Sequence, residues 1–562
     1  MQWKKISEPS VEKVDELTKI LAVPKTIATL LVQRGIEDFD SAKYFFRPEW
    51  SHLHDPLLMK DMDAAVLRIQ RAIKDGEGVM VFGDYDVDGT TSVTLVSSYL
   101  KDKIGKLRSY VPDRYTEGYG VSKKGIDEAR ADGISLIIAL DCGIKANEYV
   151  KYAKELEIDF IICDHHLPAA EIPKAVAVLD PKRNDCSYPF KELCGCGIGF
   201  KLIQALQNQL GLPESELSSY LDLVAIAIAA DIVPMVGENR ILTFLGLQQL
   251  ELHPRPGLTF FLKNLKRTLN VTDLVFVIAP RINAAGRMDQ GLNAVELLMS
   301  TDNESALPIA RSIEFFNIER KTTDERITIE ALQQIKLNQE TQNTSSVVFH
   351  PSWHKGVIGI VASRLIEHYY RPTVVLTKSE EVISGSVRSV PGFDVYNALE
   401  ACKDSIIQFG GHKYAAGLTI KPNQLDKFKV DFETYTKANI LPEQREPSIT
   451  YDLDIDFSDL NLKLLRIINQ MSPFGPKNMR PIFVTHECKD AGGSRLVGND
   501  KTHLRLDIID SAGNRFSGIG FGLGHHLSEV KKQKPFSVLY TLEENHYNGS
   551  TSLQLKIKNF KF

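Results

Sequence analysis

The heptapeptide GDYDVDG at residues 83–89 decides the fold, because three carboxylates alternate there directly after an apolar run at residues 79–82. The run has the length of a buried strand, and a helical pattern begins at Ser92. Three anions held together repel one another, and a bound cation is the usual remedy. Carboxylate oxygens are hard ligands that suit Mg²⁺ or Mn²⁺. The segment therefore predicts a metal site where a strand gives way to a helix.

Two other interpretations of the acidic heptapeptide have to be weighed. An EF-hand calcium loop opens in the same way, but it requires a bidentate glutamate at its twelfth position. Counted from Asp84, that position is Leu95, so the EF-hand interpretation fails. A solvated acidic loop that holds no metal stays open on this segment alone.

Beyond the heptapeptide, strand-length apolar runs continue to alternate with helical segments. The further runs lie at residues 136–140, 160–163 and 175–179. Continuous apolar runs are typical of strands buried on both faces of a parallel sheet. The segments between them, such as 147–156, are long enough for crossover helices. The pattern predicts an α/β domain over residues 62–240.

Acids and imidazoles follow the ends of these predicted strands. Asp141 comes directly after one run, and Asp164-His165-His166 comes directly after the next. The carboxyl ends of parallel strands meet at one edge of a sheet, where the ligands of α/β proteins bind. Asp231 interrupts the apolar run 225–233, where a carboxylate is costly unless it is paired or bound to a metal. A lone buried aspartate is more often a helix cap, but together these segments favour a two-metal site for hydrolysis at phosphorus.

The rest of the chain divides into four further regions. Residues 1–61 are expected to form short helices broken by prolines, and residues 241–344 a helical connector with one long helix at 303–338. Residues 345–440 repeat the α/β pattern. Residues 441–562 carry short β-type runs between Gly and Asn turns, which indicate a small OB-like β-barrel. The expected fold class is α/β, with two α/β domains joined by a long helix and a C-terminal OB-like β-barrel.

Composition narrows the classes of function. The 562 residues are 43% hydrophobic and 25% charged, which fits several folded domains. A net charge of −5 argues against a cationic coat over the whole surface but allows a local basic groove. Seven cysteines form no paired CxxC, so a zinc site is not expected and a reducing setting fits. The N-terminus lacks an apolar leader and no apolar run is long enough to span a membrane, so we expect a cytoplasmic protein.

The ordered motifs of the chain resemble those of the DHH phosphoesterases, and most closely those of the RecJ exonucleases. The first half matches through GDYDVDG, Asp-Cys-Gly at 141–143, Asp-His-His at 164–166 and ADIVP at 230–234. The second half resembles the RecJ-type continuation and the DHHA1 domain through RINAAGRM at 281–288, WHKGVIGIVASR at 353–364, GSVRS at 385–389 and FGGH at 409–412. Each motif alone is weak, but their order and spacing are specific, and the resemblance covers essentially the whole chain.

The resemblance implies a set of metal ligands. In that family four matching residues hold one metal ion, here Asp88, Asp141, His165 and Asp231. Asp86 would serve a second ion, with Asp141 bridging the two. Related small phosphoesterases place a histidine four residues before Asp86, where this chain has Phe82, and Asp84 is the nearby substitute. The expected cofactor is therefore one or two Mn²⁺ or Mg²⁺ ions, and occupancy of the second site is open.

The resemblance also implies the catalytic residues and the substrate. The expected catalytic residues are His166, Asp86 and Asp141, with His166 contacting the scissile phosphate or helping to protonate the leaving oxygen. RecJ enzymes degrade single-stranded DNA from the 5′ end and release 5′-mononucleotides, so a pocket for the terminal phosphate is expected. The partners implied are single-stranded DNA with a 5′ end, a single-strand binding protein and a helicase, in recombination and repair. We expect a monomer and no membrane.

The expected phosphate pocket centres on Ser386 and Arg388. One residue apart, they would point to the same side of an extended segment, and arginine offers phosphate a planar fork. The full set of expected substrate-binding residues is Arg114, Arg281, Arg287, His354, Ser386, Arg388, Gly411 and His412. For His354 and His412, a turn histidine bonded to the backbone is an equally good interpretation.

Two other functions stay open on the sequence. A nanoRNA or cyclic-dinucleotide phosphodiesterase could use the same core, although such relatives are usually shorter and lack the β-rich tail. A non-catalytic strand-binding or replication scaffold is the other alternative. Such proteins lose metal ligands, whereas all four motifs carry theirs here.

Overall fold

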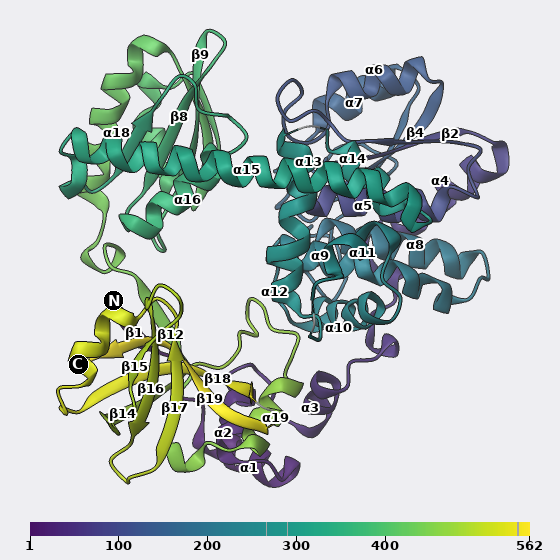
Figure 1. Cartoon of the computed structure of the whole chain (residues 1–562). Coiled ribbons are helices and arrows are strands. Elements are labelled where there is room, and N and C mark those ends of the chain that lie inside the picture. The colour runs from purple at the N-terminus through teal and green to yellow at the C-terminus, as the bar shows by residue number, and fades with distance from the viewer. Residues whose placement is uncertain (266, 289, 548–549) are drawn as a thin grey trace.

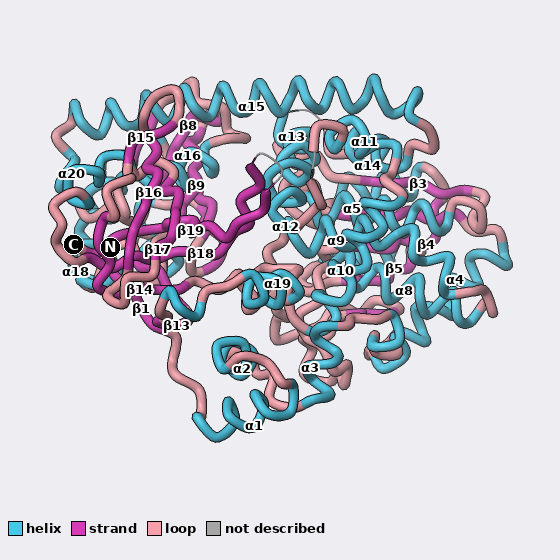
Figure 2. The backbone as a smooth tube through the Cα atoms, turned by 60° about the horizontal axis from the view of Figure 1, so that its bottom comes forward, coloured by secondary structure: helices cyan, strands magenta, loops and turns pink. Residues whose placement is uncertain are grey.

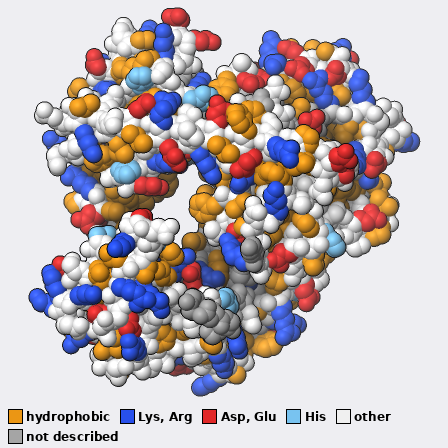
Figure 3. Space-filling view, viewed as in Figure 1, with side chains coloured by type: hydrophobic (Ala, Val, Ile, Leu, Met, Phe, Trp, Pro, Cys, Tyr) orange, Lys and Arg blue, Asp and Glu red, His pale blue; other side chains and the backbone are white. Residues whose placement is uncertain are grey.

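The structure, a computed structural model, describes residues 1–265, 267–288, 290–547 and 550–562. Two α/β bodies are joined by the long helix α15 (Asn303–Leu337), and a third, mostly β body lies below them (Figure 1). In the space-filling view the three bodies surround an opening (Figure 3). The expected fold class is confirmed.

The first body contains a five-stranded sheet in which every pairing is parallel. In the order β3-β2-β4-β5-β6, its strands are β3 (Lys106–Tyr110), β2 (Gly78–Gly83), β4 (Ile134–Leu140), β5 (Asp159–Cys163) and β6 (Ala177–Leu179). The sequence predicted four of these strands and missed β3. That edge strand has the sequence KLRSY and is partly exposed, so it lacks a continuous apolar run.

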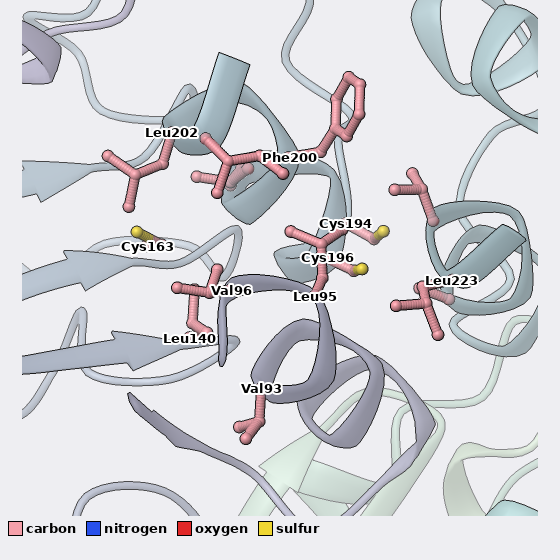
Figure 4. Packing of buried hydrophobic residues seen from close by; sticks show 14 of the residues in the cluster. Val93, Leu95, Val96, Leu140, Cys163, Cys194, Cys196, Phe200, Leu202 and Leu223 are labelled. Atoms are coloured by element: carbon pink, nitrogen blue, oxygen red, sulfur yellow. The ribbon is translucent and has the colours of Figure 1, made fainter. Parts of the chain in front are cut away.

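Helices cover both faces of this sheet and extend well beyond residue 240. They are α4 (Met62–Asp75), α5 (Val87–Leu100), α6 (Lys123–Ala131), α7 (Asn147–Glu155), α8 (Gly195–Gln209), α9 (Leu221–Ala230), α10 (Gly237–Leu252), α11 (Pro256–Leu262), α12 (Val271–Asp273), α13 (Ala279–Met288) and α14 (Leu292–Met299). Helices α6 and α7 pack on one face, while α4, α5 and α8 pack on the other. Figure 4 shows Cys194 and Cys196 of the α8 N-terminus beside Leu95 of α5. One apolar core runs from Met59 to Ile313, so the first half of the expected connector is part of this body.

Helix α15 has 35 residues and matches the long helix expected at 303–338 almost residue for residue. The Asp302 side chain caps it by accepting a hydrogen bond from the Ser305 backbone N–H. Figure 2 shows α15 running from the first body to the second. Its start packs with the first core and its end with the second body, so it fixes the distance between them.

The second body is a mixed sheet with helices. In the order β10-β11-β9-β8-β7, its strands are β10 (Gln408–His412), β11 (Ala415–Ile420), β9 (Val382–Arg388), β8 (Thr373–Ser379) and β7 (Ser346–Phe349). Only β7 and β8 pair in parallel. The helices are α16 (Ile358–His368), α17 (Val395–Ala401) and α18 (Leu425–Asn439).

The third body combines the two ends of the chain. Its strands are β12 (Ser448–Tyr451), β13 (Leu453–Asp454), β14 (Phe483–Asp490), β15 (Arg495–Val497), β16 (His503–Ile509), β17 (Arg515–Gly520), β18 (Phe536–Tyr547) and β19 (Ser550–Lys561), with helices α19 (Leu462–Gln470) and α20 (Leu527–Val530). Strands β14, β18, β19, β17 and β16 pair in a closed cycle, as an OB-like barrel requires.

The N-terminal helices do not stand apart as a separate region. Helices α1 (Val11–Leu21), α2 (Lys25–Val32) and α3 (Phe39–Phe46) pack into one apolar core with the barrel. Strand β1 (Gln2–Lys5) pairs in parallel with β12, which no local pattern in its sequence QWKK could reveal. None of the helices that the structure describes is long and apolar enough to cross a membrane.

Candidate active site

The acidic heptapeptide forms the turn from β2 into α5. Asp84 follows β2 and is fully buried, and Asp86 caps α5 by accepting a hydrogen bond from the Gly89 backbone N–H at 3.0 Å. A Cβ on Gly89 would lie 2.3 Å from the Asp84 carbonyl oxygen. Glycine therefore lets the first turn of the helix approach the end of the strand, and this approach brings the carboxylates together.

The N-terminus of α8 holds the next carboxylate, Asp88. Its two oxygens accept hydrogen bonds from the backbone N–H groups of Gly195 and Cys196 at 2.7 and 2.8 Å. The glycines at 195–199 suggest a tight turn before a helix in sequence, but they are the first residues of α8 itself. The positive end of a helix stabilises a carboxylate. The sequence did not predict this contact between Asp88 and the N-terminus of α8.

Asp141 lies at the carboxyl end of β4 in an unusual backbone conformation. Its φ of 59° is left-handed, and its N–H donates to the Cys163 carbonyl oxygen at 2.9 Å. A Cβ on Gly195 would lie 2.6 Å from the Asp141 Cβ, so only glycine fits there. Strained backbone of this kind persists where the surroundings over-determine it, and it is concentrated at functional sites.

Three carboxylates converge on one imidazole nitrogen. The Nε2 of His165 lies 3.1 Å from an oxygen of Asp141, 3.6 Å from one of Asp231 and 3.8 Å from one of Asp88. Burial is the largest cause that lowers the pKa of His165, to about 3, so the ring is neutral at pH 7. Its Nδ1 has no hydrogen-bond partner. A neutral nitrogen among three carboxylates matches the donor set of a divalent metal ion.

The carboxyl groups themselves show why a cation is needed. Burial first, and then the negative charges of Asp88, Asp86, Asp231 and Asp84, raise the pKa of Asp141 well above its usual range. The Oδ2 of Asp84 is buried without a hydrogen-bond partner. The residues therefore fit the expected metal: Asp88, Asp141, His165 and Asp231 could hold one ion, and Asp84 and Asp86 lie near enough to Asp141 to affect its charge.

His166 is organised differently from His165. Its Nδ1 lies 2.7 Å from Asp164 Oδ1, and its Nε2 lies 3.2 Å from the hydroxyl of Tyr119. Burial alone would lower the pKa of His166, but the Asp164 carboxylate raises it overall. The structure also brings ligand atoms of His166, Asp141 and His165 together in one group that could hold an ion. It therefore places His166 where it can face substrate or metal.

Two residues of this arrangement were not among the expected site residues. Asp164 is buried and accepts hydrogen bonds from the backbone N–H groups of His165, His166 and Ile144. It orients the His166 ring and fixes the backbone at both histidines. Tyr119 also donates to the Asp141 carbonyl oxygen at 3.2 Å. In the sequence, Tyr119 was marked only by its position in the Gly-containing loop 113–120, which also contains Arg114.

The raised pKa values predict how metal binding depends on pH. Burial and then the charge of Asp86 raise the pKa of Asp88 to about 6, while burial and then the charge of Asp88 raise that of Asp231 to about 8. A carboxyl must lose its proton before it binds a cation, so Mn²⁺ affinity should increase from pH 6 to pH 8, and binding near pH 7 should release protons. Titration calorimetry in two buffers of different ionisation enthalpy measures this release. Affinity that stays flat over this range would contradict the assignment.

The same groups set the pH dependence of stability in the metal-free protein. Their pKa values in the folded state lie above the unfolded value of about 3.9. Between that value and about pH 8 the folded state binds more protons, so the free energy of unfolding decreases as pH rises. Thermal melts in chelator should therefore decline from pH 6 to pH 8 more steeply than melts with Mn²⁺.

Arginines gather on the side of the site that faces the second body. Arg388 donates to the Ser386 hydroxyl at 3.1 Å, so both point to the same side of β9 as predicted. Burial first, and then the positive charges of Arg114, Arg320 and Arg388, lower the pKa of Arg287 to about 9. Arg114 lies over the Tyr85 ring at 4.8 Å. Among the residues that the structure describes, Arg114, Arg287 and Arg388 have no carboxylate within ion-pair distance, so this cluster is suited to an external anion.

Arg281 is a correction to the expected pocket. Its guanidinium forms an ion pair with Glu314 of α15 and donates to the Val277 carbonyl oxygen. It also lies 5.2 Å from the Phe261 ring centroid. Helix α13 sends Arg281 and Arg287 in different directions because they are six residues apart, and only Arg287 reaches the arginine cluster.

The residues of the two glycine-rich turns have different roles. His354 accepts a hydrogen bond from the Gly356 backbone N–H at 3.1 Å, and its ring contacts the Tyr115 ring edge-on. Gly411 and His412 line a cavity of about 640 Å³ together with His166 and Asp86. The second body therefore closes one side of a cavity whose other side carries Asp86, Asp164 and His166. For His354 the structure supports the turn interpretation.

Comparison with known proteins agrees with this geometry. Three family models match in order: the DHH family N-terminal domain at residues 78–228, the DHHA1 domain at 342–438 and the RecJ OB domain at 451–559. The single-stranded-DNA-specific exonuclease RecJ of Bacillus subtilis is 36% identical over 564 residues, which cover 100% of this chain and 70% of that protein. RecJ of Escherichia coli is 30% identical, with 97% of this chain and 98% of that protein covered.

A solved structure matches over the full length of the chain. The crystal structure of RecJ in complex with Mn²⁺ from Thermus thermophilus has a TM-score of 0.85 at 25% identity, covering 100% of this chain and 79% of that one. Fold and donor set together define a metal-dependent phosphoesterase with a DHH core. More narrowly, the chain belongs to the RecJ family of single-stranded-DNA-specific exonucleases.

Proposed function

We propose that the chain is a 5′→3′ exonuclease specific for single-stranded DNA, which hydrolyses phosphodiester bonds with Mn²⁺ or Mg²⁺ and releases 5′-mononucleotides. The observation that carries the proposal is the cluster of Arg114, Arg287 and Arg388. None of them has a carboxylate within ion-pair distance among the described residues, and Arg114 is near enough to Asp84 to act on its pKa. A phosphate is the anion that such planar forks recognise best. A terminal phosphate held there would present the first phosphodiester to the metal centre.

The metal and the protein would divide the chemistry between them. When bound, the metal ions supply electrostatic stabilisation of the phosphoryl oxygens and lower the pKa of water. Asp88, Asp141, His165 and Asp231 would hold one ion, and Asp86 with Asp84 would serve a second. Asp164 raises the pKa of His166 and lies at its Nδ1, so a proton on Nε2 would be the one donated to the leaving oxygen. Tyr119 stays close enough to orient that ring.

The closed arrangement of the three bodies supports selectivity for single-stranded over double-stranded DNA. The opening between them is bounded by the two α/β bodies, the long helix α15 and the barrel (Figures 1 and 3). OB-like barrels bind single strands through aromatic and basic side chains. We propose that a single strand threads through the opening and that a duplex is too wide. A single-strand binding protein and a helicase as partners, a monomeric state and a cytoplasmic location remain part of this proposal.

Substrate length separates this function from its alternative. The purified protein is incubated with Mn²⁺ and single strands of increasing length, with matched duplexes as the comparison. The proposed function predicts that long single strands are degraded to mononucleotides while duplexes stay intact. Activity confined to dinucleotides and very short oligomers would instead support a nanoRNA or cyclic-dinucleotide phosphodiesterase.

A further inference from the structure

Next to the metal carboxylates lies a small second pocket that the proposed mechanism does not use. Its volume is about 210 Å³, and its lining includes Ala230, Asn283, Arg287, Arg320 and Ile360. Ala230 directly precedes the metal-binding Asp231, so the pocket borders the metal centre. The rest of the lining is apolar and none of it is acidic, which leaves the two arginines as its only charges.

Arg320 comes from α15, the helix that joins the two α/β bodies. Its Nη2 donates to Asn317 Oδ1 at 3.0 Å, and its Nη1 lies 3.5 Å from Asp324 Oδ2. Asn317 and Asp324 are both fully buried on the same helix, so they hold the guanidinium from either side. Asp324 also pairs with Arg364 of α16 at 2.7 Å. One buried carboxylate thus serves two arginines.

Hydrogen-bonding capacity is left over at this position. The Nε of Arg320 and the Nδ2 of Asn317 are buried donors without a partner. Both oxygens of Asp324 are buried without a hydrogen bond as well, so Asp324 meets Arg320 as an ion pair only and leaves these donors free. The Arg287 guanidinium bonds only to the Gly356 carbonyl oxygen among the described residues, at 2.9 Å. Unpaired buried donors and clustered positive charges cost free energy unless an anion with several acceptor oxygens is present. A phosphate group has that chemistry and fits the size of the pocket.

We infer that Arg320 is a further substrate-binding residue, which together with Arg287 holds a phosphate of the DNA strand next to Asp231. The inference rests on the proposed function, because it takes the ligand to be DNA. Asn317 and Asp324 are positioning residues that fix the guanidinium without contacting the strand. The helix that sets the distance between the two bodies thereby also contributes to the site. The phosphate can be the terminal one or an internal one, and the experiment separates the two.

The test measures binding of a fluorescent single strand in chelator, where no turnover occurs. Arg320→Ala and Arg320→Lys are compared with wild type on 5′-phosphorylated and 5′-hydroxyl strands over a range of salt concentrations. Arg326→Ala is the matched control, because Arg326 lies on the same helix, is exposed and pairs only with Glu330 among the described residues. Melting temperatures are recorded for every variant.

We expect Arg320→Ala to weaken binding by about 10- to 100-fold and to reduce the salt slope by about 0.7, the value for one phosphate contact on a single strand. The lysine variant should recover the salt slope but only part of the affinity, since the fork is lost. In turnover assays KM should rise more than kcat falls. If the affinity for both strands falls equally, Arg320 contacts an internal phosphate. If only the affinity for the 5′-phosphorylated strand falls, Arg320 contacts the terminal phosphate.

Unchanged affinity and salt slope, with only a lower melting temperature, would overturn the inference and leave Arg320 as an interhelical ion-pair residue. If the alanine variant does not fold, Arg320→Gln removes the charge while it keeps a donor for Asn317, and the same readouts apply. Failure of the wild-type protein to bind single strands would instead count against the proposed function. The two failures are therefore distinguishable.

Discussion

Replacing Asp141 by asparagine should abolish nuclease activity, with a loss of at least about 10³-fold in rate, the scale expected when electrostatic stabilisation at the reacting phosphate is removed. Asp141 is 3.1 Å from His165 Nε2, and the charges of four other aspartates raise its pKa. Asparagine tolerates the left-handed backbone at this position, so the fold should persist.

The same substitution makes a second prediction in the absence of metal. It removes a buried acid whose ionised form the fold disfavours, so the chelated variant should melt at a higher temperature than chelated wild type at pH 8. Added Mn²⁺ should stabilise wild type but not the variant. Asp75→Asn, at an exposed position at the end of α4, is the control. Full activity of Asp141→Asn, or normal stabilisation by Mn²⁺, would remove Asp141 from the metal site.

The second prediction with a large effect concerns recognition of the 5′ end of the DNA strand. Arg388→Ala should reduce the preference for a 5′-phosphate over a 5′-hydroxyl strand by about 10- to 100-fold in kcat/KM, because a charge-assisted hydrogen bond is lost. Arg388 is partly buried, bonds to Ser386 and has no carboxylate partner among the described residues. Arg388→Lys should restore part of the preference, since the charge remains but the fork is lost.

The Arg388 measurement compares initial rates on the two kinds of strand end. Lys378→Ala is the control, because Lys378 is exposed on β8 of the same sheet. Melting temperatures show whether each variant is folded. If Arg388→Ala lowers the rate equally on both strand ends, Arg388 contributes to general strand binding, and the terminal-phosphate pocket has to be sought elsewhere.

Local patterns predicted much of the fold. The continuous apolar runs marked β2, β4, β5 and β6 because strands buried on both faces need no polar alternation. The long breaker-poor stretch predicted α15 to within a residue of its ends at 303 and 337. Strand β1 and its partner β12 could not be predicted, because a pairing between residues some 446 positions apart leaves no local signal.

The side chains at 84–88, 141 and 164–166 could be expected to meet because they follow strand ends at one edge of the sheet, whereas Asp231 follows helix α9. The arginines could not be sorted in the same way. Arg281 and Arg287 lie in one motif, and only the packing of α13 against α15 shows that Glu314 engages the first. Arg320 lies in a helix that looks like a solvated spacer in sequence, and its buried partner Asp324 becomes visible only in three dimensions. Residues that are brought together by the strand order of a sheet can be predicted from the sequence. Residues whose position depends on how a helix is rotated about its axis cannot.

The most direct test of the central claim is digestion of one single strand, labelled at its 5′ end in one sample and at its 3′ end in another, with Mn²⁺ and with chelator. The proposed mechanism predicts that the 5′ label appears at once as a mononucleotide, that the 3′ label appears in progressively shorter strands, and that chelator stops both. Immediate release of a mononucleotide from the 3′ label, or degradation that continues in chelator, would contradict it.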